Sequence, residues 1–327
     1  MIDVSHSPPE PVIVSAQQER IIRACCQYQW LTIPDMAMIL GLPTSGNYVR
    51  RLAASLAGKR DGVPGQLLFR FALNQRSGGG GPRVFVPGEA SRDLLRQEQD
   101  TDGFVWHSPS TMQRYSHSFV CHNLAVARLC ICAALFCRDN PSYYLVETRL
   151  SSDIAPTPPR ASFTLDGKPT TSIVIPDSWL FIERVADGEG TALWCEIDNA
   201  TTYRQAFTRR LSARLALITS EAYAEFFGTD AVVLCYAVLS NESRMHTLRY
   251  WTWDLLVRAE REQLASRFLF TTIEYTKLYE HIQTLFTKPV WALPADRSQE
   301  DAPKVALFPP PQDKEASHGT SAQTSDE

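Results

Sequence analysis

The sequence predicts an α/β protein built from two domains, a small α+β domain followed by a larger α/β domain. Residues 18–96 contain three short amphipathic segments and then two short apolar runs around a glycine-rich turn, which is the pattern of three helices and a β-hairpin. Residues 118–240 follow the order helix, three strands, helix, strand. With 327 residues and 44% hydrophobic content, the chain is long enough to bury two cores.

The helices of the first domain are marked by their ends. Residues 1–17 lack periodicity and are rich in Pro and Ser, which predicts a disordered leader. A first helix is expected from Gln18 to about Leu31. Thr32 is a suitable N-cap for a short second helix, with Asp35 three residues later and Gly41 after its end. A third helix is expected over residues 46–57.

Two predicted strands, residues 66–73 and 83–87, follow the third helix. Helix, helix, helix, hairpin is the order of a winged helix-turn-helix, so residues 18–96 are predicted to be a DNA-binding domain. Between residues 47 and 96, nine basic residues stand against three acidic ones, which favours a polyanionic partner. The residues expected to contact double-stranded DNA are Asn47, Arg50, Arg51, Lys59, Arg60, Arg76 and Arg83. A solvated helix face, or a protein-docking use of the same fold, is the alternative.

The rest of the chain is predicted to form a linker, a second domain and a tail. Residues 97–117 show no sustained pattern and are predicted to be an interdomain linker. The domain at 118–295 is expected to contain helices at 119–136, 203–227, 245–262 and 278–286 and strands at 143–150, 173–175, 193–195, 231–239, 267–272 and 290–293. A Pro-rich loop is expected at 151–169. Residues 296–327 hold seven acidic and three basic residues and are predicted to be a disordered acidic tail, apart from 305–308.

Acidic residues follow two apolar runs of the second domain. Asp177 comes after the run 173–175, and Glu196 and Asp198 come after Leu193. If these runs pair as neighbouring strands, Glu196 and Asp198 share one face, where Asp177 can join them. Carboxylates are seldom buried without a partner. The cluster therefore predicts a metal ion, basic partners or shifted pKa values.

The layout of residues 118–295, with acids on successive strands, resembles the PD-(D/E)XK nuclease fold. The resemblance implies that Asp177 and Glu196 hold a divalent cation, Mg²⁺ or Mn²⁺, which activates water for phosphodiester cleavage. Such sites normally carry a lysine two residues after the second acid, and Asp198 stands there in this chain. The catalytic set expected from this resemblance is Glu147, Asp177, Glu196, Asp198, Arg204 and Arg210.

Arginines of the following helix are the cations available to replace that lysine. Helical counting from Phe207 places Arg204 and Arg214 where they can lean toward the sheet, with Arg210 just outside the apolar stripe and Arg209 pointing away. The alternative to catalysis is that the acids pair structurally with these arginines. His122 is expected to be an ordinary helix histidine or a contact of the acidic cluster.

The two halves together resemble the replication-relaxation proteins of bacterial plasmids and other mobile elements. The resemblance covers about residues 18–295, and its motifs are His117, the run 122–126, Pro176–Asp177, and Glu196–Ile197–Asp198 followed by Thr201. The family commonly has Arg-Gly before that threonine, whereas this chain has Asn199–Ala200.

The resemblance implies a DNA-binding role in plasmid or mobile-element replication or relaxation, with plasmid replication or mobilisation proteins as partners. One alternative is a metal-dependent endonuclease that nicks DNA through Asp177 and Glu196. A second is a transcription regulator or protein-docking module with a degenerate nuclease domain.

Cysteine usage and hydropathy bear on location. The eight cysteines are scattered, with no C-x-x-C pair, so they are expected to be reduced core residues of a cytoplasmic protein. No signal-like N-terminus is expected, and no apolar run is expected to approach the ~18 residues of a membrane span. The oligomeric state is left open.

Overall fold

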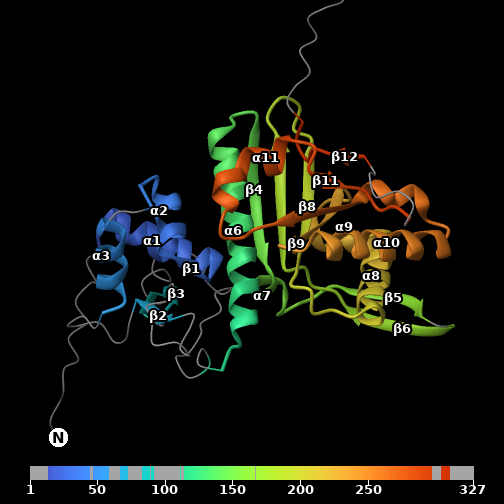
Figure 1. Ribbon diagram of the computed structural model, residues 1–327, viewed down its shortest axis with the longest axis horizontal. Coiled ribbons are helices and arrows are strands. Elements are labelled where there is room, and N and C mark those ends of the chain that lie inside the picture. The colour runs from blue at the N-terminus through green and yellow to red at the C-terminus, as the bar shows by residue number, and fades with distance from the viewer. Residues whose placement is uncertain are drawn as a thin grey trace, which may run out of the picture.

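The computed structural model describes residues 14–44, 47–58, 67–72, 83–88, 90–91, 111, 114–165, 167–296 and 303–309. A helical N-terminal unit lies on one side of a large mixed sheet, and a long helix stands between them (Figure 1). This arrangement confirms the α/β class that the sequence predicts.

The N-terminal unit has the element order of a winged helix. Its elements are α1 (Ala16–Tyr28), β1 (Leu31–Thr32), α2 (Ile33–Leu40), α3 (Asn47–Leu56), β2 (Leu68–Ala72) and β3 (Arg83–Pro87). The strands form an antiparallel sheet in the order β1-β3-β2. Gly41 ends α2 with φ of 70°, a left-handed conformation that glycine adopts without steric penalty. Ser15 caps α1. Residues 14–17, which were predicted to belong to the disordered leader, are therefore part of the folded unit.

Several predictions for this unit lie outside the described residues. They are the hairpin tip, the contact residues Lys59, Arg60 and Arg76, and most of the predicted linker at 97–117. The leader before Val14 and the tail after Pro309 lie outside them as well.

The second unit is a seven-stranded sheet between helices. Its elements are α6 (His117–Asp139), β4 (Tyr143–Leu150), α7 (Ser151–Ile154), β5 (Arg160–Leu165), β6 (Lys168–Ile173), β7 (Ser178–Arg184), β8 (Gly190–Asp198), α8 (Arg204–Ile218), α9 (Glu221–Phe227), β9 (Val232–Leu239), α10 (Glu242–Arg258), η1 (Glu262–Arg267), β10 (Phe268–Ile273), η2 (Leu278–His281), α11 (Ile282–Thr287), β11 (Trp291–Ala292) and β12 (Lys304–Val305). The order is β12-β11-β10-β9-β8-β7-β4. Strands β4, β7 and β8 are antiparallel neighbours, whereas β8, β9 and β10 are parallel.

The predicted order helix, three strands, helix, strand is present, but its middle strand was wrongly assigned. The strand beside β8 is β7, whose residues Trp179 to Ile182 are apolar on both faces, as a strand between two helix layers requires. The run at 173–175 does not belong to the large sheet, and only Ile173 lies in a strand, as the last residue of β6. Strands β5 and β6 form a separate hairpin, in which β5 lies inside the predicted loop 151–169 and β6 begins at its end. Asp177 therefore precedes a sheet strand and does not follow one.

Two further boundaries differ from the prediction. The expected helix at 203–227 divides at Thr219, and Ser220 is the N-cap of α9. Part of the predicted tail packs on the domain, because β12 pairs with β11 and the Phe308 ring stacks on Phe136 at 5.6 Å. The apolar residues at 305–308, set apart in the sequence, explain this contact.

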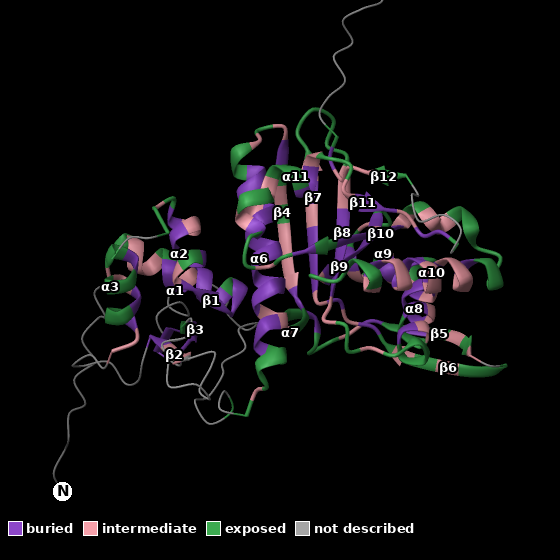
Figure 2. Ribbon diagram, viewed as in Figure 1, coloured by how far each residue is buried: buried purple, intermediate pink, exposed green. Residues whose placement is uncertain are grey.

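The sheet separates two hydrophobic cores. Leu193 and Cys195 of β8 face the core under α6, whereas Ala192 and Trp194 face the core under α8 and α10. The central strands are therefore buried on both faces (Figure 2).

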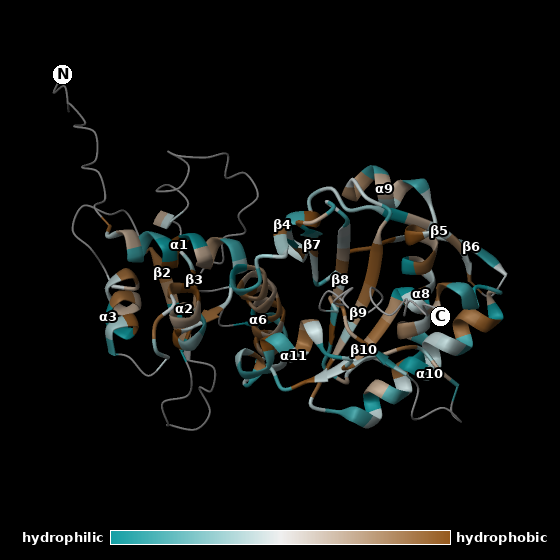
Figure 3. Cartoon of the chain, turned by 90° about the horizontal axis from the view of Figure 1, so that it is seen from above, coloured by the Kyte–Doolittle hydropathy of each residue, from teal (hydrophilic) through white to brown (hydrophobic). Residues whose placement is uncertain are grey.

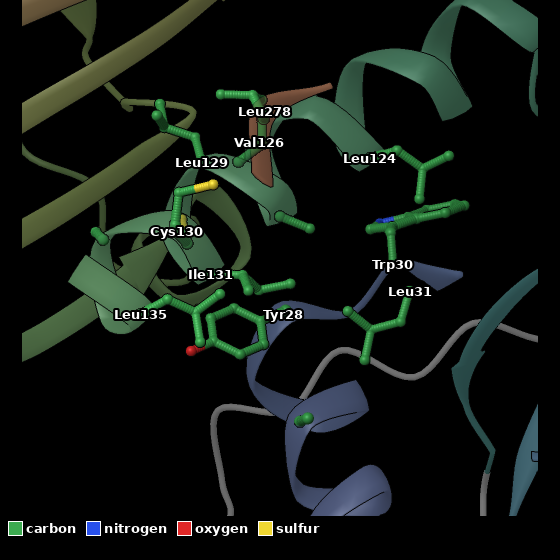
Figure 4. Close-up of a cluster of buried hydrophobic side chains, with 14 of the residues drawn as sticks. Tyr28, Trp30, Leu31, Leu124, Val126, Leu129, Cys130, Ile131, Leu135 and Leu278 are labelled. Atoms are coloured by element: carbon green, nitrogen blue, oxygen red, sulfur yellow. The ribbon is translucent and has the colours of Figure 1, made fainter. Parts of the chain in front are cut away.

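Helix α6 is the element that the two units share. It is long and apolar enough to cross a membrane, contrary to the expectation that no run approaches that length, and 78% of its most apolar window is buried inside the protein. Its apolar character has a structural cause, since the sheet packs on one side and the N-terminal unit on the other. Tyr28, Trp30 and Leu31 meet side chains of α6 such as Leu124 and Ile131 (Figure 4).

A buried ion pair lies within this junction. The Arg128 Nε of α6 donates to Asp35 Oδ1 of α2 at 2.8 Å, and the hydroxyl of Tyr279 donates to the same oxygen at 2.8 Å. The backbone N–H and the hydroxyl of Thr32 both donate to Asp35 Oδ2 at 2.6 Å. Arg128 also donates to the carbonyl of Tyr275 and to the hydroxyl of Thr32. Asp35 is fully buried, and its two oxygens accept four hydrogen bonds.

We expect Arg128→Met to destabilise the protein by about 3–5 kcal/mol, because it leaves the buried Asp35 carboxylate without its counter-charge. Urea unfolding measures the difference. Arg138→Met is the matched control, since Arg138 lies on the same helix but pairs with Asp139 at the surface, and we expect it to change stability by less than about 1 kcal/mol. Equal effects of the two substitutions would contradict a structural role for the buried pair.

Candidate functional site

The exposed face of α3 is the first candidate site. Val49, Ala53 and Leu56 are buried against the N-terminal unit. The exposed residues are Asn47, Tyr48, Arg50, Arg51, Ala54 and Ser55. The helix sequence contains no acidic residue, so this face is cationic.

The position of α3 leaves this face accessible. Both views place α3 at the end of the molecule away from the large sheet (Figures 1 and 3). Of the predicted DNA contacts, Asn47, Arg50, Arg51 and Arg83 are exposed on this unit. Arg70 of β2 is exposed as well, although the sequence reasoning did not single it out.

The second candidate site begins with Asp177, in the loop before β7. Its Oδ2 accepts the backbone N–H of Ile197 at 2.7 Å, and its Oδ1 lies 3.3 Å from Nε2 of His122 on α6. Burial lowers the pKa of the His122 imidazole, but the hydrogen bond and negative charge of Asp177 outweigh burial and raise that pKa above its usual value. His122 therefore contacts the acidic cluster, which is one of the two roles expected for it from the sequence.

Glu196 on β8 is paired with an arginine. Its Oε2 lies 2.6 Å from Nη2 of Arg214, and its Oε1 accepts the indole N–H of Trp194 at 2.8 Å. Arg214 also donates to the hydroxyl of Tyr236 at 3.2 Å. Burial raises the pKa of the Glu196 carboxyl, and the positive charge of Arg214 opposes that shift.

A cavity of about 530 Å³ joins these groups. Its lining residues come from the segment 172–175, from β8, from α8 and from the Asp177 loop: Ser172, Ile173, Val174, Ile175, Asp177, Glu196, Ala206, Arg209, Arg210, Ala213 and Arg214. The structure therefore brings together Asp177, Glu196 and Arg210 of the predicted catalytic set. Arg209, which helical counting placed away from the sheet, also lines this cavity.

The other predicted catalytic residues lie elsewhere. Glu147 pairs with Arg149 on the edge strand β4, at 2.6 Å. Arg204 extends to Asp254 of α10 at 2.6 Å and does not lean toward the sheet. Asp198 forms a two-pronged ion pair with Arg244 at the start of α10, at 3.0 and 3.1 Å. None of these three predicted residues lines the cavity.

Arg244 and Arg149 were not predicted as partners of the acidic residues. Arg244 lies 46 residues after Asp198, and no local pattern links the two. Arg149 lies two positions from Glu147 on the same strand, where side chains share a face, so strand alternation was a usable signal for that pair.

The donor set at Asp177 and Glu196 fits a divalent cation poorly in this arrangement. Both oxygens of Glu196 are engaged by Arg214 and Trp194, and one oxygen of Asp177 is engaged by the Ile197 amide. Within the described ranges, no group of three or more His, Cys, Asp and Glu residues is placed to hold a metal ion. The cation next to Glu196 is the guanidinium of Arg214.

The turn after β8 is held in an unusual conformation. Ala200 has a φ of 58°, in the left-handed region. Its N–H donates to Asp198 Oδ1 at 2.8 Å, and the Asn199 amide donates to the Ser118 hydroxyl at 2.7 Å. Glycine adopts this conformation without the steric penalty that the Cβ of Ala200 brings.

We expect Ala200→Gly to stabilise the protein by up to about 1 kcal/mol, because it removes that penalty. Ala216→Gly, in the interior of α8, is the matched control and should destabilise by about 1 kcal/mol, since glycine disfavours helices. Thermal and urea unfolding of the two variants measure both effects. Destabilisation by Ala200→Gly would contradict the strained turn.

Comparison of the chain with protein-family models, curated proteins and solved structures found no match.

Proposed function

We propose that the protein binds double-stranded DNA through α3 and the β2–β3 hairpin. The observation that carries this proposal is the exposed face of α3, on which Asn47, Arg50 and Arg51 stand together without an acidic neighbour on that helix. This helix is the second of the helix-turn-helix pair, the position that enters the DNA major groove in such folds.

Each polar group on this face has a chemical role in such a complex. Arginine can bind phosphate oxygens or pair with the edge of guanine, and asparagine can pair with the edge of adenine. Arg83, at the end of β3 next to the hairpin loop, adds a contact to the DNA backbone from the wing. Phosphate contacts of this kind supply most of the affinity and make it depend on salt.

The resemblance to replication-relaxation proteins supplies the biological setting of the proposal. We place the protein in the cytoplasm of a bacterium, acting in plasmid or mobile-element replication or relaxation with replication or mobilisation proteins as partners. All eight cysteines are free and buried, which is compatible with a reducing compartment.

We expect Arg50→Ala with Arg51→Ala to weaken duplex binding by roughly tenfold or more at 0.1 M salt, because two phosphate contacts are lost. The slope of log affinity against log salt concentration should fall by about 0.9 for each lost contact. Fluorescence anisotropy with a labelled duplex across a salt series measures both quantities.

Arg138→Ala with Arg261→Ala is the control for net charge, since it removes two exposed arginines from the second unit. It should leave duplex affinity nearly unchanged. Salt-insensitive binding, or equal weakening by the control, would contradict the proposal. Binding of a partner protein without DNA affinity would favour the docking-module alternative.

The nuclease alternative has one observation in its favour, namely that Asp177 and Glu196 line the same cavity. Binding of Mg²⁺ or Mn²⁺ there would require Arg214 to leave Glu196. We therefore expect no nicking of supercoiled plasmid above the level in EDTA with either metal. Metal-dependent nicking that Asp177→Asn abolishes would establish the nuclease instead.

A further inference from the structure

One face of α8 forms a wall of the cavity. Ala206, Arg209, Arg210, Ala213 and Arg214 line it, at the spacing i, i+3, i+4, i+7, i+8 that places residues on one side of a helix. Ala206 and Ala213 have short side chains, so they leave space beside the arginine side chains.

The charges in this cavity do not cancel. Arg214 is paired with Glu196, and Asp177 is paired with His122. Arg209 and Arg210 are exposed, and neither has a hydrogen bond or ion pair to any described residue. The wall therefore carries two neighbouring guanidinium groups whose N–H donors are not bonded to any described residue.

A second part of the cavity lining is different in character. It consists of residues 172–175, in which Ile173, Val174 and Ile175 are apolar. Ile173 is 54% exposed, although it is a large hydrophobic residue. The N–H of Val174 donates to the carbonyl of Pro159 at 3.0 Å, which anchors this segment to the strand pair β5–β6.

We propose that this cavity binds a nucleotide, with its phosphate on Arg209 and Arg210 and its base against the wall of Ile173 and Ile175. The guanidinium fork matches phosphate oxygens geometrically, and two such groups match the charge of a phosphate monoester. The volume of about 530 Å³ lies within the range of small-molecule sites.

The paired residues give this site its preorganisation. Arg214 is buried and held by Glu196 and Tyr236, so this part of the wall does not have to be ordered on binding. The nucleotide is either free in solution or part of a DNA strand, and in both cases the two arginines would bind non-bridging phosphate oxygens, of which the monoester carries the larger negative charge. This site is separate from α3 and does not depend on duplex binding there.

Isothermal titration calorimetry of the full chain in EDTA tests the proposal with three probes: deoxyadenosine monophosphate, deoxyadenosine, and a short single-stranded oligonucleotide. The oligonucleotide is titrated into an Arg50→Ala, Arg51→Ala background, which removes the proposed contribution of α3. We expect the monophosphate or the oligonucleotide to bind, and deoxyadenosine to bind at least roughly tenfold more weakly because it lacks a phosphate.

Arg209→Gln with Arg210→Gln should weaken that binding by roughly tenfold or more. Both side chains are exposed, so folding should be retained, and circular dichroism verifies this. Arg261→Gln with Lys288→Gln removes the same charge from exposed positions that do not line the cavity and should have no effect.

The pattern of binding identifies the source of the nucleotide. Arginine-dependent binding of the monophosphate indicates a free nucleotide, whereas arginine-dependent binding of the oligonucleotide alone indicates a DNA strand. If neither probe binds, or if the arginine variant matches the control, the proposal is overturned. Loss of duplex binding in the α3 variant does not affect the binding of the probes to the cavity. Each of the two proposals can therefore be overturned without the other.

Discussion

The arrangement of the whole chain depends on one buried ion pair, Asp35 with Arg128. Asp35 has two functions, because it caps the start of α2 and also accepts the guanidinium of α6. A buried carboxylate with four hydrogen bonds tolerates little displacement of its partners. Around it, Trp30 and Leu31 pack on α6, so the winged helix and the sheet share one continuous core. The two candidate sites, α3 and the cavity, are consequently held at fixed positions relative to each other.

Much of the fold could be predicted from local sequence signals. Thr32 and Gly41 bound α2 as expected, and helical periodicity located α1, α3, α6 and α10 within a few residues. The strand β7 was missed because its run Trp179–Ile182 is apolar throughout and shows no alternation. The neighbouring run at 173–175 was chosen in its place.

The candidate site was less predictable, since it depends on contacts between distant residues. Asp177 and Glu196 do meet in one cavity, and Arg214 was foreseen as a residue able to reach the sheet. Asp198 pairs with Arg244, which lies 46 residues later in the chain. Asp35 pairs with Arg128, which lies 93 residues later. No periodicity or capping rule links such positions. Arg209 was expected to point away because positions were counted from the Phe207 stripe, whereas the cavity lies along the flank of α8 that Arg209 shares with Ala206, Arg210 and Ala213.

The carboxylates that first suggested a metal site are engaged by other side chains of the protein. Glu196 pairs with Arg214 and Asp198 with Arg244, and Asp177 lies 3.3 Å from His122, whose pKa it raises. What remains uncompensated in the cavity is positive charge, on Arg209 and Arg210. A site with this balance favours a phosphate group over a divalent cation.

The N-terminal unit and the sheet domain are expected to form one cooperative unit through α6. Native-state hydrogen exchange tests it directly by comparing the opening free energies of amides in α1, such as Ile22, with those of amides in the centre of α6 and β8. The account predicts that the most protected amides of all three elements open with the same free energy, equal to that of global unfolding. If the amides of α1 exchange through an opening of markedly lower free energy while those of α6 and β8 stay protected, the two units are independent and the account is wrong.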